Sequence, residues 1–311
     1  MIKHALLMLS LLLAAQASAD GSSAYDWFGR MVQAAREQNY SGVLLYGNQR
    51  HWDSLAVQHA LQDGQEYERL QRLTGAPLEQ LRQGEQVFFL NPAVGQPLQN
   101  PLHSFLPGPD LRDQYELTLG GNDRIAGHYA RLIVLQPKDQ HRYAMRLWLE
   151  QKTALLLRSE LLDERQQVLE RVQFAQLEIG SIMPAELFTR PASEPVPPAP
   201  SYPDDDVSWQ PDWLPAGFSR LAARQQGDDI QLLFSDGLAA FSVFVDRPAA
   251  TIAPLQKRWG ATAAVVQQVK NEAGESRRVT VVGELPATTL QKIAGSVQPV
   301  AAAAPKAAQQ E

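Results

Sequence analysis

Residues 139–174 read DQHRYAMRLWLEQKTALLLRSELLDERQQVLERVQF, and their pattern predicts the fold of most of the chain. Met145, Leu147 and Leu149 are separated by single residues of other kinds. That period of two places successive side chains on opposite faces of a β-strand. We predict that the face carrying these three apolar residues points inward, toward a hydrophobic core.

The sequence on both sides of this stretch has the same strand-like character. Its runs are rich in β-branched and aromatic residues, and Gly-Asn, Asp-Gly and Asn-Pro turn signals separate them. We predict strands at residues 41–49, 51–62, 64–74, 85–92, 115–120, 124–136, 142–151, 154–163 and 166–179. Consecutive strands tend to be neighbours in a sheet. The predicted fold class is therefore mainly β (α+β), built on a large curved antiparallel sheet.

One amphipathic helix precedes these strands. Apolar residues recur at helical spacing from Trp27 to Ala35, and Ser23 and Asp26 have the spacing of a capping box. The apolar face of a sheet must be covered by another layer. Because this is the one long helix predicted for so large a sheet, the concave side could remain partly unfilled.

An unfilled concave side would form an apolar ligand cavity. The residues that we predict to line it are Val87, Phe89, Leu132, Val134, Met145, Leu147 and Leu149. The alternative is an ordinary filled core, with the proline-rich loop at 92–109 as its lid.

Basic residues lie on or beside the middle strands of the predicted sheet. Guanidinium groups suit bidentate phosphate binding. The candidate phosphate contacts are Arg124, Arg131, Arg142 and Arg146, with Lys138 beside them. For any one of them, an exposed charge on a strand or turn is the simpler interpretation.

The N-terminus has the form of a secretory signal. Lys3 and His4 precede an apolar run, and Ala17-Ser18-Ala19 follows it as a cleavage site. The apolar run is shorter than the roughly 20 residues of a membrane-spanning helix. We expect cleavage after Ala19 and a periplasmic location.

A cluster of nine prolines from Pro184 to Pro215 marks the division of the chain. Proline lacks an amide donor and fixes φ, which favours an extended linker. We predict a first domain at 20–183, a linker at 184–208 and a second domain at 209–298, followed by a disordered tail at 299–311.

The second domain offers candidates for a protein interface. Phe241, Val243 and Val245 point to one face of a predicted strand, and Phe244 points to the other. An exposed aromatic residue could anchor a partner. Phe244, Arg277 and Arg278 are the candidate partner contacts, against the alternative of core packing for Phe244 and plain solvation for the arginines. A helix is expected after Pro286.

Composition and motifs exclude several classes of function. The 311-residue chain has no cysteine and a formal charge of −6, which argues against thiolate metal sites and nucleic-acid binding. No catalytic or nucleotide-binding motif is present, so we expect neither an enzyme nor a cofactor. His51 and His59 would lie about 26 Å apart in an extended strand, which is too far to share a metal ion with Asp53 unless the chain turns between them.

Four segments resemble the RseB/MucB family of periplasmic regulators of an envelope-stress sigma factor. They are residues 139–174, DWLPAGF at 212–218, SDGLAAFSVFVD at 235–246 and VTVVGELP at 279–286. The likeness covers nearly the whole mature chain, in order. Some relatives carry cysteines that are absent here, so a disulfide in those relatives has no counterpart in this chain.

The resemblance implies both a fold and a function. The larger domain would be similar to LolA/LolB lipoprotein carriers, a half-open β-barrel lined with apolar side chains, and the smaller domain an antiparallel sheet with a helix. The family binds the periplasmic part of a membrane-spanning anti-sigma factor of the RseA or MucA type and shields it from the site-one protease. Lipopolysaccharide or mislocalised lipoprotein acyl chains would occupy the cavity and cause release.

Two functions therefore follow as hypotheses. In the first, lipid in the larger domain shifts the placement of the two domains and weakens binding of the anti-sigma factor. In the second, the protein is a lipid or lipoprotein carrier without a regulatory partner, although such a carrier would not need a second domain. The natural ligand, the partner contacts and the oligomeric state, including a homo-oligomer, stay open.

Overall fold

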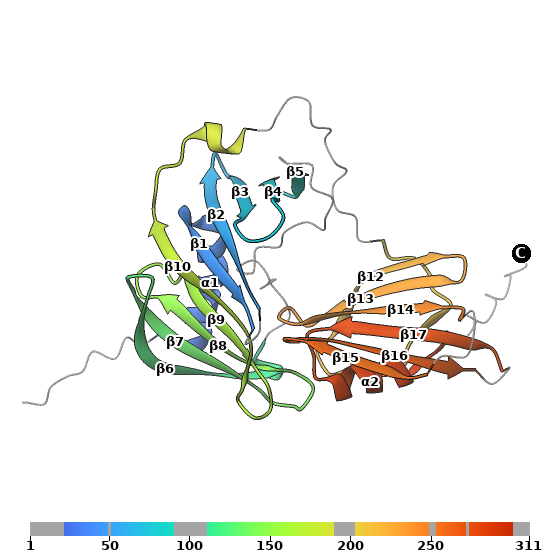
Figure 1. Ribbon diagram of the computed structural model, residues 1–311. Coiled ribbons are helices and arrows are strands. Elements are labelled where there is room, and N and C mark those ends of the chain that lie inside the picture. The colour runs from blue at the N-terminus through green and yellow to red at the C-terminus, as the bar shows by residue number, and fades with distance from the viewer. Residues whose placement is uncertain are drawn as a thin grey trace, which may run out of the picture.

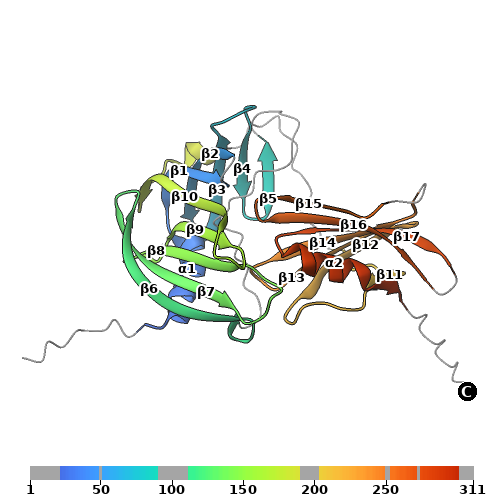
Figure 2. The same ribbon diagram turned by 60° about the horizontal axis from the view of Figure 1, so that its bottom comes forward.

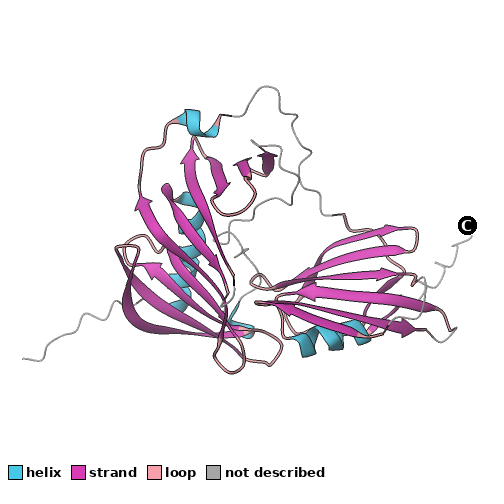
Figure 3. Cartoon of the chain, viewed as in Figure 1, coloured by secondary structure: helices cyan, strands magenta, loops and turns pink. Residues whose placement is uncertain are grey.

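The computed structural model describes residues 22–48, 51–89, 111–189, 203–248, 253–271 and 274–300. The predicted signal peptide and the predicted loop at 92–109 lie outside these ranges, as do most of the predicted linker and tail. Strands dominate the described chain and helices are few (Figure 3). None of its helices combines the length and apolar character of a membrane span.

Helix α1 spans Ala24–Glu37, and Ser23 caps its N-terminus. The Ser23 hydroxyl accepts a hydrogen bond from the Asp26 amide at 3.1 Å, while the Asp26 carboxylate accepts one from the Ser23 amide at 2.8 Å. Such a reciprocal pair satisfies donors that the first helical turn leaves unpaired. The capping box predicted from the sequence is confirmed.

The larger domain contains one ten-stranded antiparallel sheet (Figure 1). Its strands are β1 (Tyr40–Gly47), β2 (Trp52–Gln62), β3 (Gln65–Arg72), β4 (Glu79–Gln83), β5 (Gln86–Phe89), β6 (Tyr115–Ile125), β7 (His128–Pro137), β8 (Ala144–Glu150), β9 (Leu156–Leu162) and β10 (Val168–Ile179). Their order across the sheet is β5-β4-β3-β2-β1-β10-β9-β8-β7-β6. The predicted antiparallel architecture is confirmed.

This sheet curves around α1, which lies inside the curve (Figure 2). Trp27 and Met31 of the helix share one hydrophobic core with Tyr40, Leu44 and Leu147 of the sheet. All five side chains are at most 3% exposed, and full burial of a large apolar side chain contributes about 1.5–3 kcal/mol. Among the described helices, α1 is thus the one that packs on the concave side of the large sheet.

Two details of the strand prediction are wrong. Strand β4 was missed because its sequence, EQLRQ, has one apolar residue and no β-branched one. The single strand predicted at 124–136 is the end of β6 and most of β7, because Ala126 and Gly127 adopt φ values of 47° and 86° and reverse the chain between them. Positive φ values suit tight hairpin turns.

The smaller domain is a six-stranded antiparallel sheet with one helix. The strands are β12 (Ser219–Gln226), β13 (Asp229–Ser235), β14 (Ala240–Asp246), β15 (Leu255–Trp259), β16 (Thr262–Lys270) and β17 (Ser276–Gly283), in the order β12-β13-β14-β17-β16-β15. Helix α2 (Ala287–Gly295) covers one face (Figure 2), where Leu290 and Ile293 are fully buried. Strands β11 (Trp209–Pro211) and β18 (Val297–Pro299) form a separate pair.

Described residues at both ends of the predicted linker pack on the domains. A short 3-10 helix, Ala185–Phe188, follows β10, and Phe188 packs against Leu81 and Phe88 of the larger domain. At the other end, Asp204 forms a bridge with Ala223 of β12. The domain boundaries at 184 and 208 stay predictions.

Replacing Met31 with alanine tests whether α1 stabilises the larger domain. Because Met31 is 1% exposed in the core, Met31→Ala should lower the free energy of unfolding by about 2–5 kcal/mol, measured by urea denaturation. Arg36→Ala, at an exposed position of the same helix, should change it by less than about 0.5 kcal/mol. Equal effects of the two variants would mean that α1 does not pack as described.

Candidate functional site

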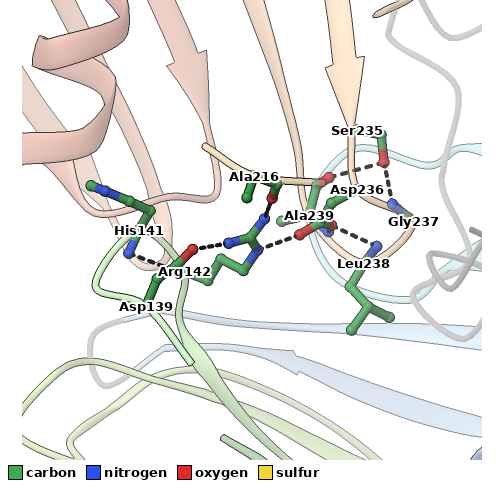
Figure 4. A network of polar contacts seen from close by, with 9 residues as sticks. All are labelled: Asp139, His141, Arg142, Ala216, Ser235, Asp236, Gly237, Leu238 and Ala239. Atoms are coloured by element: carbon green, nitrogen blue, oxygen red, sulfur yellow. Dashed lines mark hydrogen bonds and ion pairs between the residues drawn. The ribbon is translucent and has the colours of Figure 1, made fainter. Parts of the chain in front are cut away.

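The turn between β7 and β8 reaches from the larger domain into the smaller one and carries Arg142 (Figure 4). Arg142 Nε donates a hydrogen bond to Asp236 Oδ2 at 2.7 Å. Nη1 donates to Asp139, and Nη2 donates to the carbonyl oxygen of Ala216. Each guanidinium nitrogen therefore has a partner, and the side chains of Arg142 and Asp236 have no exposed surface.

Asp236 is held by its own turn as well as by Arg142. Its Oδ1 accepts hydrogen bonds from the backbone amides of Leu238 and Ala239 at 2.9 and 2.8 Å. Burial disfavours the charged form of Arg142, but the hydrogen bond to Asp236 and the nearby negative charges outweigh it and raise the pKa of Arg142. Such charge-assisted hydrogen bonds are the strong ones in proteins, so the two domains meet at a fixed, charged point.

Aromatic rings enclose this ion pair. The guanidinium carbon of Arg142 lies 5.0 Å from the centroid of Phe218 and 5.9 Å from that of Tyr115. Burial raises the pKa of the Tyr115 hydroxyl, and the negative charge of Asp236 adds to the effect. The rings exclude water and attract the cation, which strengthens the electrostatic contact between the domains.

Neighbouring residues of the same turn make further contacts with the smaller domain. His141 Nδ1 lies 3.1 Å from Thr289 Oγ1, and its ring stands edge-on to Trp213 with centroids 5.0 Å apart. The Tyr143 hydroxyl donates to the Leu285 carbonyl oxygen at 3.1 Å. Burial lowers the pKa of His141. The neutral ring therefore predominates at neutral pH, which suits a packed interface.

The contact between the two domains, which we call the junction, also brings together the carboxylates of Glu170 and Glu284. Burial, together with the negative charge of Glu284, raises the pKa of Glu170 to about 7, although the Ala261 amide offsets part of the effect. Burial also raises the pKa of Glu284. Glu170 belongs to β10 of the larger domain and Glu284 follows β17 of the smaller one, so this part of the interface responds to protons.

The predicted cavity residues do not form one lining. Strand pairing sets Met145 beside Leu135 and Leu147 beside Ile133, whereas Leu132 lies beside Trp148. Directly paired residues share a face of the sheet. Leu132 and Val134 therefore lie on the face opposite to Met145, Leu147 and Leu149, and grouping them together was wrong.

Residues on the inward face are closely packed. Leu147 and Leu149 are 0% exposed and Met145 is 7% exposed, all within the core that includes α1. A side chain that borders a cavity large enough for water retains accessible surface, so Leu147 and Leu149 line no such cavity in this structure. Val87 is half-buried on the edge strand β5. Phe89 pairs with Gln80 through its backbone, and its side chain lies outside the described part.

The four predicted phosphate contacts have different surroundings. Arg142 is enclosed in the junction, so assigning it to a phosphate was wrong. Arg124 donates to the Gly127 carbonyl oxygen, and Arg131 donates to Asn122. Arg146 lies 3.8 Å from Glu160. These three remain at least partly accessible, and their role as phosphate contacts stays a prediction.

The histidines of β2 and its preceding turn have partners of their own. His51 Nε2 lies 3.0 Å from Asp53, whereas His59 is fully buried with Nδ1 2.8 Å from the Gln38 carbonyl oxygen. In the described ranges no group of three or more histidines, cysteines and carboxylates could hold a metal ion.

Two of the three predicted partner contacts lie together on the smaller domain. Phe244 and Arg278 line a groove of about 470 Å³, together with residues of β12 and β13. Arg277 lies on the other face, where its side chain is 6% exposed and its guanidinium lies 5.5 Å from the Trp209 ring centroid. Period two explains the separation, because adjacent residues of a strand point to opposite faces.

Sequence reasoning missed the junction. Arg142 and Asp236 are 94 residues apart, and nothing in the local pattern pairs them. The SDG turn at 235–237 and the closely spaced Asp139 and Arg142 were visible in the sequence. Polar residues of this kind are typical of turns, but the sequence does not show that Arg142 would bind Asp236.

These features define a class of two-domain, mainly β protein, in which a large sheet curved around a helix meets a smaller sheet-and-helix domain through a buried ion pair. The chain belongs to the MucB/RseB family. The model of the MucB/RseB N-terminal domain matches residues 23–198, and the model of the MucB/RseB C-terminal domain matches residues 203–298.

Relatives match over almost the full length. The sigma factor AlgU regulatory protein MucB of Pseudomonas aeruginosa is 33% identical over 312 residues, which cover 96% of this chain and 98% of MucB. The sigma-E factor regulatory protein RseB of Escherichia coli K12 is 27% identical, covering 93% of this chain and 94% of RseB.

Solved structures of MucB match the chain as a whole. The crystal structure of MucB in complex with MucA(peri) has a TM-score of 0.77 at 32% identity and covers 90% of this chain and 100% of that one. A crystal structure of MucB has a TM-score of 0.63 at 30% identity and covers 89% of this chain and 98% of that one.

Removing the Arg142 side chain should loosen the junction. Arg142→Ala leaves Asp236 buried without its cation, and breaking a buried ion pair in this way costs about 3–5 kcal/mol. We expect a lower unfolding temperature and a larger radius of gyration in small-angle scattering. Arg146→Ala, which removes a more exposed arginine of the next strand, should cost less than about 1 kcal/mol. A compact, fully stable Arg142→Ala protein would contradict the assignment.

Stability should decrease as the pH rises through neutrality. The folded protein holds the Glu170 proton up to about pH 7, whereas the unfolded chain releases it near the ordinary pKa of 4.5. The stabilisation is therefore complete below about pH 4.5 and is lost as the pH rises through about 7, by at most about 3 kcal/mol.

Glu170→Gln should flatten the pH dependence of the unfolding free energy between pH 5 and 8, leaving the part that belongs to Glu284. Glu178→Gln replaces an exposed glutamate of the same strand and should leave the profile unchanged. Parallel profiles for wild type and Glu170→Gln would argue against a protonated Glu170 at the junction.

Proposed function

We propose that this protein is a periplasmic regulator that binds the periplasmic domain of a MucA-type anti-sigma factor. The observation that carries the proposal is the match of the whole two-domain chain to MucB in complex with MucA(peri), at a TM-score of 0.77 over 90% of the chain. A second MucA/MucB complex supports it with a TM-score of 0.76. Binding, rather than catalysis, is the activity that we assign.

The N-terminal segment supports the location. Residues 1–19 have the basic start, short apolar run and small-residue cleavage site of a secretory signal. The partner in the related complex is a periplasmic domain. We therefore assign the mature protein to the periplasm.

Binding would sequester the anti-sigma factor from its site-one protease. A protease must take an extended, accessible segment into its active site, so a segment docked on this protein would be cleaved more slowly. The sigma factor would then stay bound to its anti-sigma factor as long as the complex persists.

Lipid would cause release of the anti-sigma factor. The packing of α1 determines where the lipid could enter. Trp27 and Met31 occupy the concave side of the large sheet, so an acyl chain can enter there only when α1 moves. Hydrogen bonds tie α1 to the sheet and its turns, among them one from Tyr25 to the Tyr115 carbonyl oxygen and one from Arg30 to the Lys152 carbonyl oxygen. Lipopolysaccharide or lipoprotein acyl chains would compete with α1 for this core.

Strand β8 offers a route from the lipid to the partner. Met145 and Leu147 of β8 face the core beneath α1, and Arg142 just before it holds the smaller domain. A ligand that displaces β8 would therefore also displace the ion pair. Coupling requires that lipid binds the two domain arrangements with different affinities.

The solved MucB structures support more than one arrangement for the family. Two of them match this chain with TM-scores of 0.77 and 0.63, although identity and coverage are nearly equal. Structures of MucB therefore differ from one another in shape. A lipid carrier without a regulatory partner is the alternative, and the presence of both family domains in this chain argues against it.

The proposal predicts protection of the anti-sigma factor and its reversal by lipid. Mature protein lacking residues 1–19 should bind a MucA-type periplasmic domain and slow its cleavage by the site-one protease at least tenfold. A lipid-A fragment should restore cleavage and weaken binding. Unslowed cleavage within a proven complex would contradict the protective role, and unchanged affinity with bound lipid would contradict release.

A further inference from the structure

Strand β15 (Leu255–Trp259) forms one edge of the six-stranded sheet. It pairs with β16 on one side, and no other described strand pairs with its second side. All five of its residues are exposed. An edge strand offers unpaired amide and carbonyl groups that can bind another strand, so this edge is open to strand addition.

Apolar side chains accompany the free edge. Leu255 is 59% exposed and Trp259 is 52% exposed. They are four residues apart in the strand and therefore share a face. Leu255 pairs with Val266, and the core residue Val265 lies on the opposite face with α2. The two exposed side chains thus belong to the face of the sheet that α2 does not cover.

The positive charge of the hairpin formed by β15 and β16 indicates what kind of partner could bind there. Residues 253–271 contain Lys257, Arg258 and Lys270 but no aspartate or glutamate, although the whole chain has a net charge of −6. The Lys257 ammonium lies 4.9 Å from the Trp259 ring centroid, above the edge. Opposite charges paired across strands are stabilising, so an acidic segment would complement this edge.

The same charges disfavour pairing between two copies of the chain. If two β15 strands paired antiparallel over their full length, Lys257 would lie opposite Lys257 of the second copy. Like charges directly opposite one another are destabilising, and lysine on an edge strand is a common protection against self-association. Pairing of β15 with a second copy of itself is therefore disfavoured, whereas pairing with a strand of opposite charge is favoured.

The edge also adjoins the contact between the domains. Gly260, in the turn from β15 to β16, lies so close to the larger domain that a Cβ there would be 3.2 Å from Asn48 Nδ2 and 3.6 Å from Glu170 Oε2. A partner strand on β15 would thus end beside residues whose placement depends on how the domains meet.

We propose that β15 is a docking edge for an extended acidic segment, which adds to the sheet as a seventh strand and packs apolar side chains against Leu255 and Trp259. The inference rests on the proposed function, because the segment belongs to the periplasmic domain of the anti-sigma factor. Main-chain hydrogen bonds supply affinity in this mode of recognition, and alternate side chains supply specificity. Docking next to Gly260 makes affinity sensitive to the domain arrangement.

Charge reversal on the edge tests the proposal. Lys257→Glu should weaken binding of the MucA-type periplasmic domain at least tenfold, measured by titration calorimetry with the full mature chain. Lys270→Glu makes the same charge change at the far end of β16, away from the edge, and should alter affinity less than about twofold. Leu255→Ser should also weaken binding, since it removes an exposed apolar contact without changing charge.

Hydrogen exchange provides the second measurement. Binding of the anti-sigma domain should slow exchange of β15 amides, which a side-chain contact alone would not do. Wild-type binding with unprotected β15 amides and an unaffected Lys257→Glu variant would overturn the docking edge and leave the proposed function standing.

Three further outcomes each decide against the proposal. Loss of binding in Arg278→Glu but not in Lys257→Glu would place the segment in the groove beside Phe244. A dimer of the wild-type chain that Leu255→Ser abolishes would assign the edge to a second copy. Failure of the wild-type protein to bind the anti-sigma domain would refute the proposed function itself.

Discussion

A buried arginine holds the two domains of this protein in one arrangement. Arg142 and Asp236 have no exposed surface, and their 2.7 Å contact is the central interaction that makes the two buried charges tolerable. When the domains separate, water hydrates both charges again. When only one partner is removed, the other stays buried without its counter-charge, which costs free energy. The pair forms only when both turns are in place, so it fixes the orientation of the two domains as well as stabilising their contact.

In the described part of the larger domain, the one long helix packs inside the curve of the sheet. Trp27 and Met31 occupy space that an apolar ligand would need. Ligand entry and helix packing are therefore alternatives, and the free energy of packing α1 sets a threshold that a ligand must exceed. Under the proposed function, this threshold would let misplaced lipid act on the protein while trace amounts of apolar solutes would not.

Local sequence pattern was enough for most of the fold. The capping box at Ser23, the inward face of Met145, Leu147 and Leu149, and most strands of the larger domain followed from local spacing and composition, because the structure repeats the local geometry of helix and strand. Strand β4 lacked the apolar and β-branched residues that such a pattern requires. The predicted cavity lining wrongly grouped Leu132 and Val134 with the residues of β8. They were chosen because they are apolar, and the pairing of β7 with β8 shows that they lie on the other face of the sheet.

By itself, the sequence determined the fold class, which depends on periodicity and turn signals, and its resemblance to known segments indicated the family to which the chain belongs. The tertiary structure decided which side chains meet. It showed that Arg142, a predicted phosphate contact, instead pairs with Asp236, 94 residues away. It also placed β15 at an edge of its sheet where no other described strand pairs with it. Contacts between distant segments depend on strand register and domain placement, which many residues set jointly and no short stretch encodes.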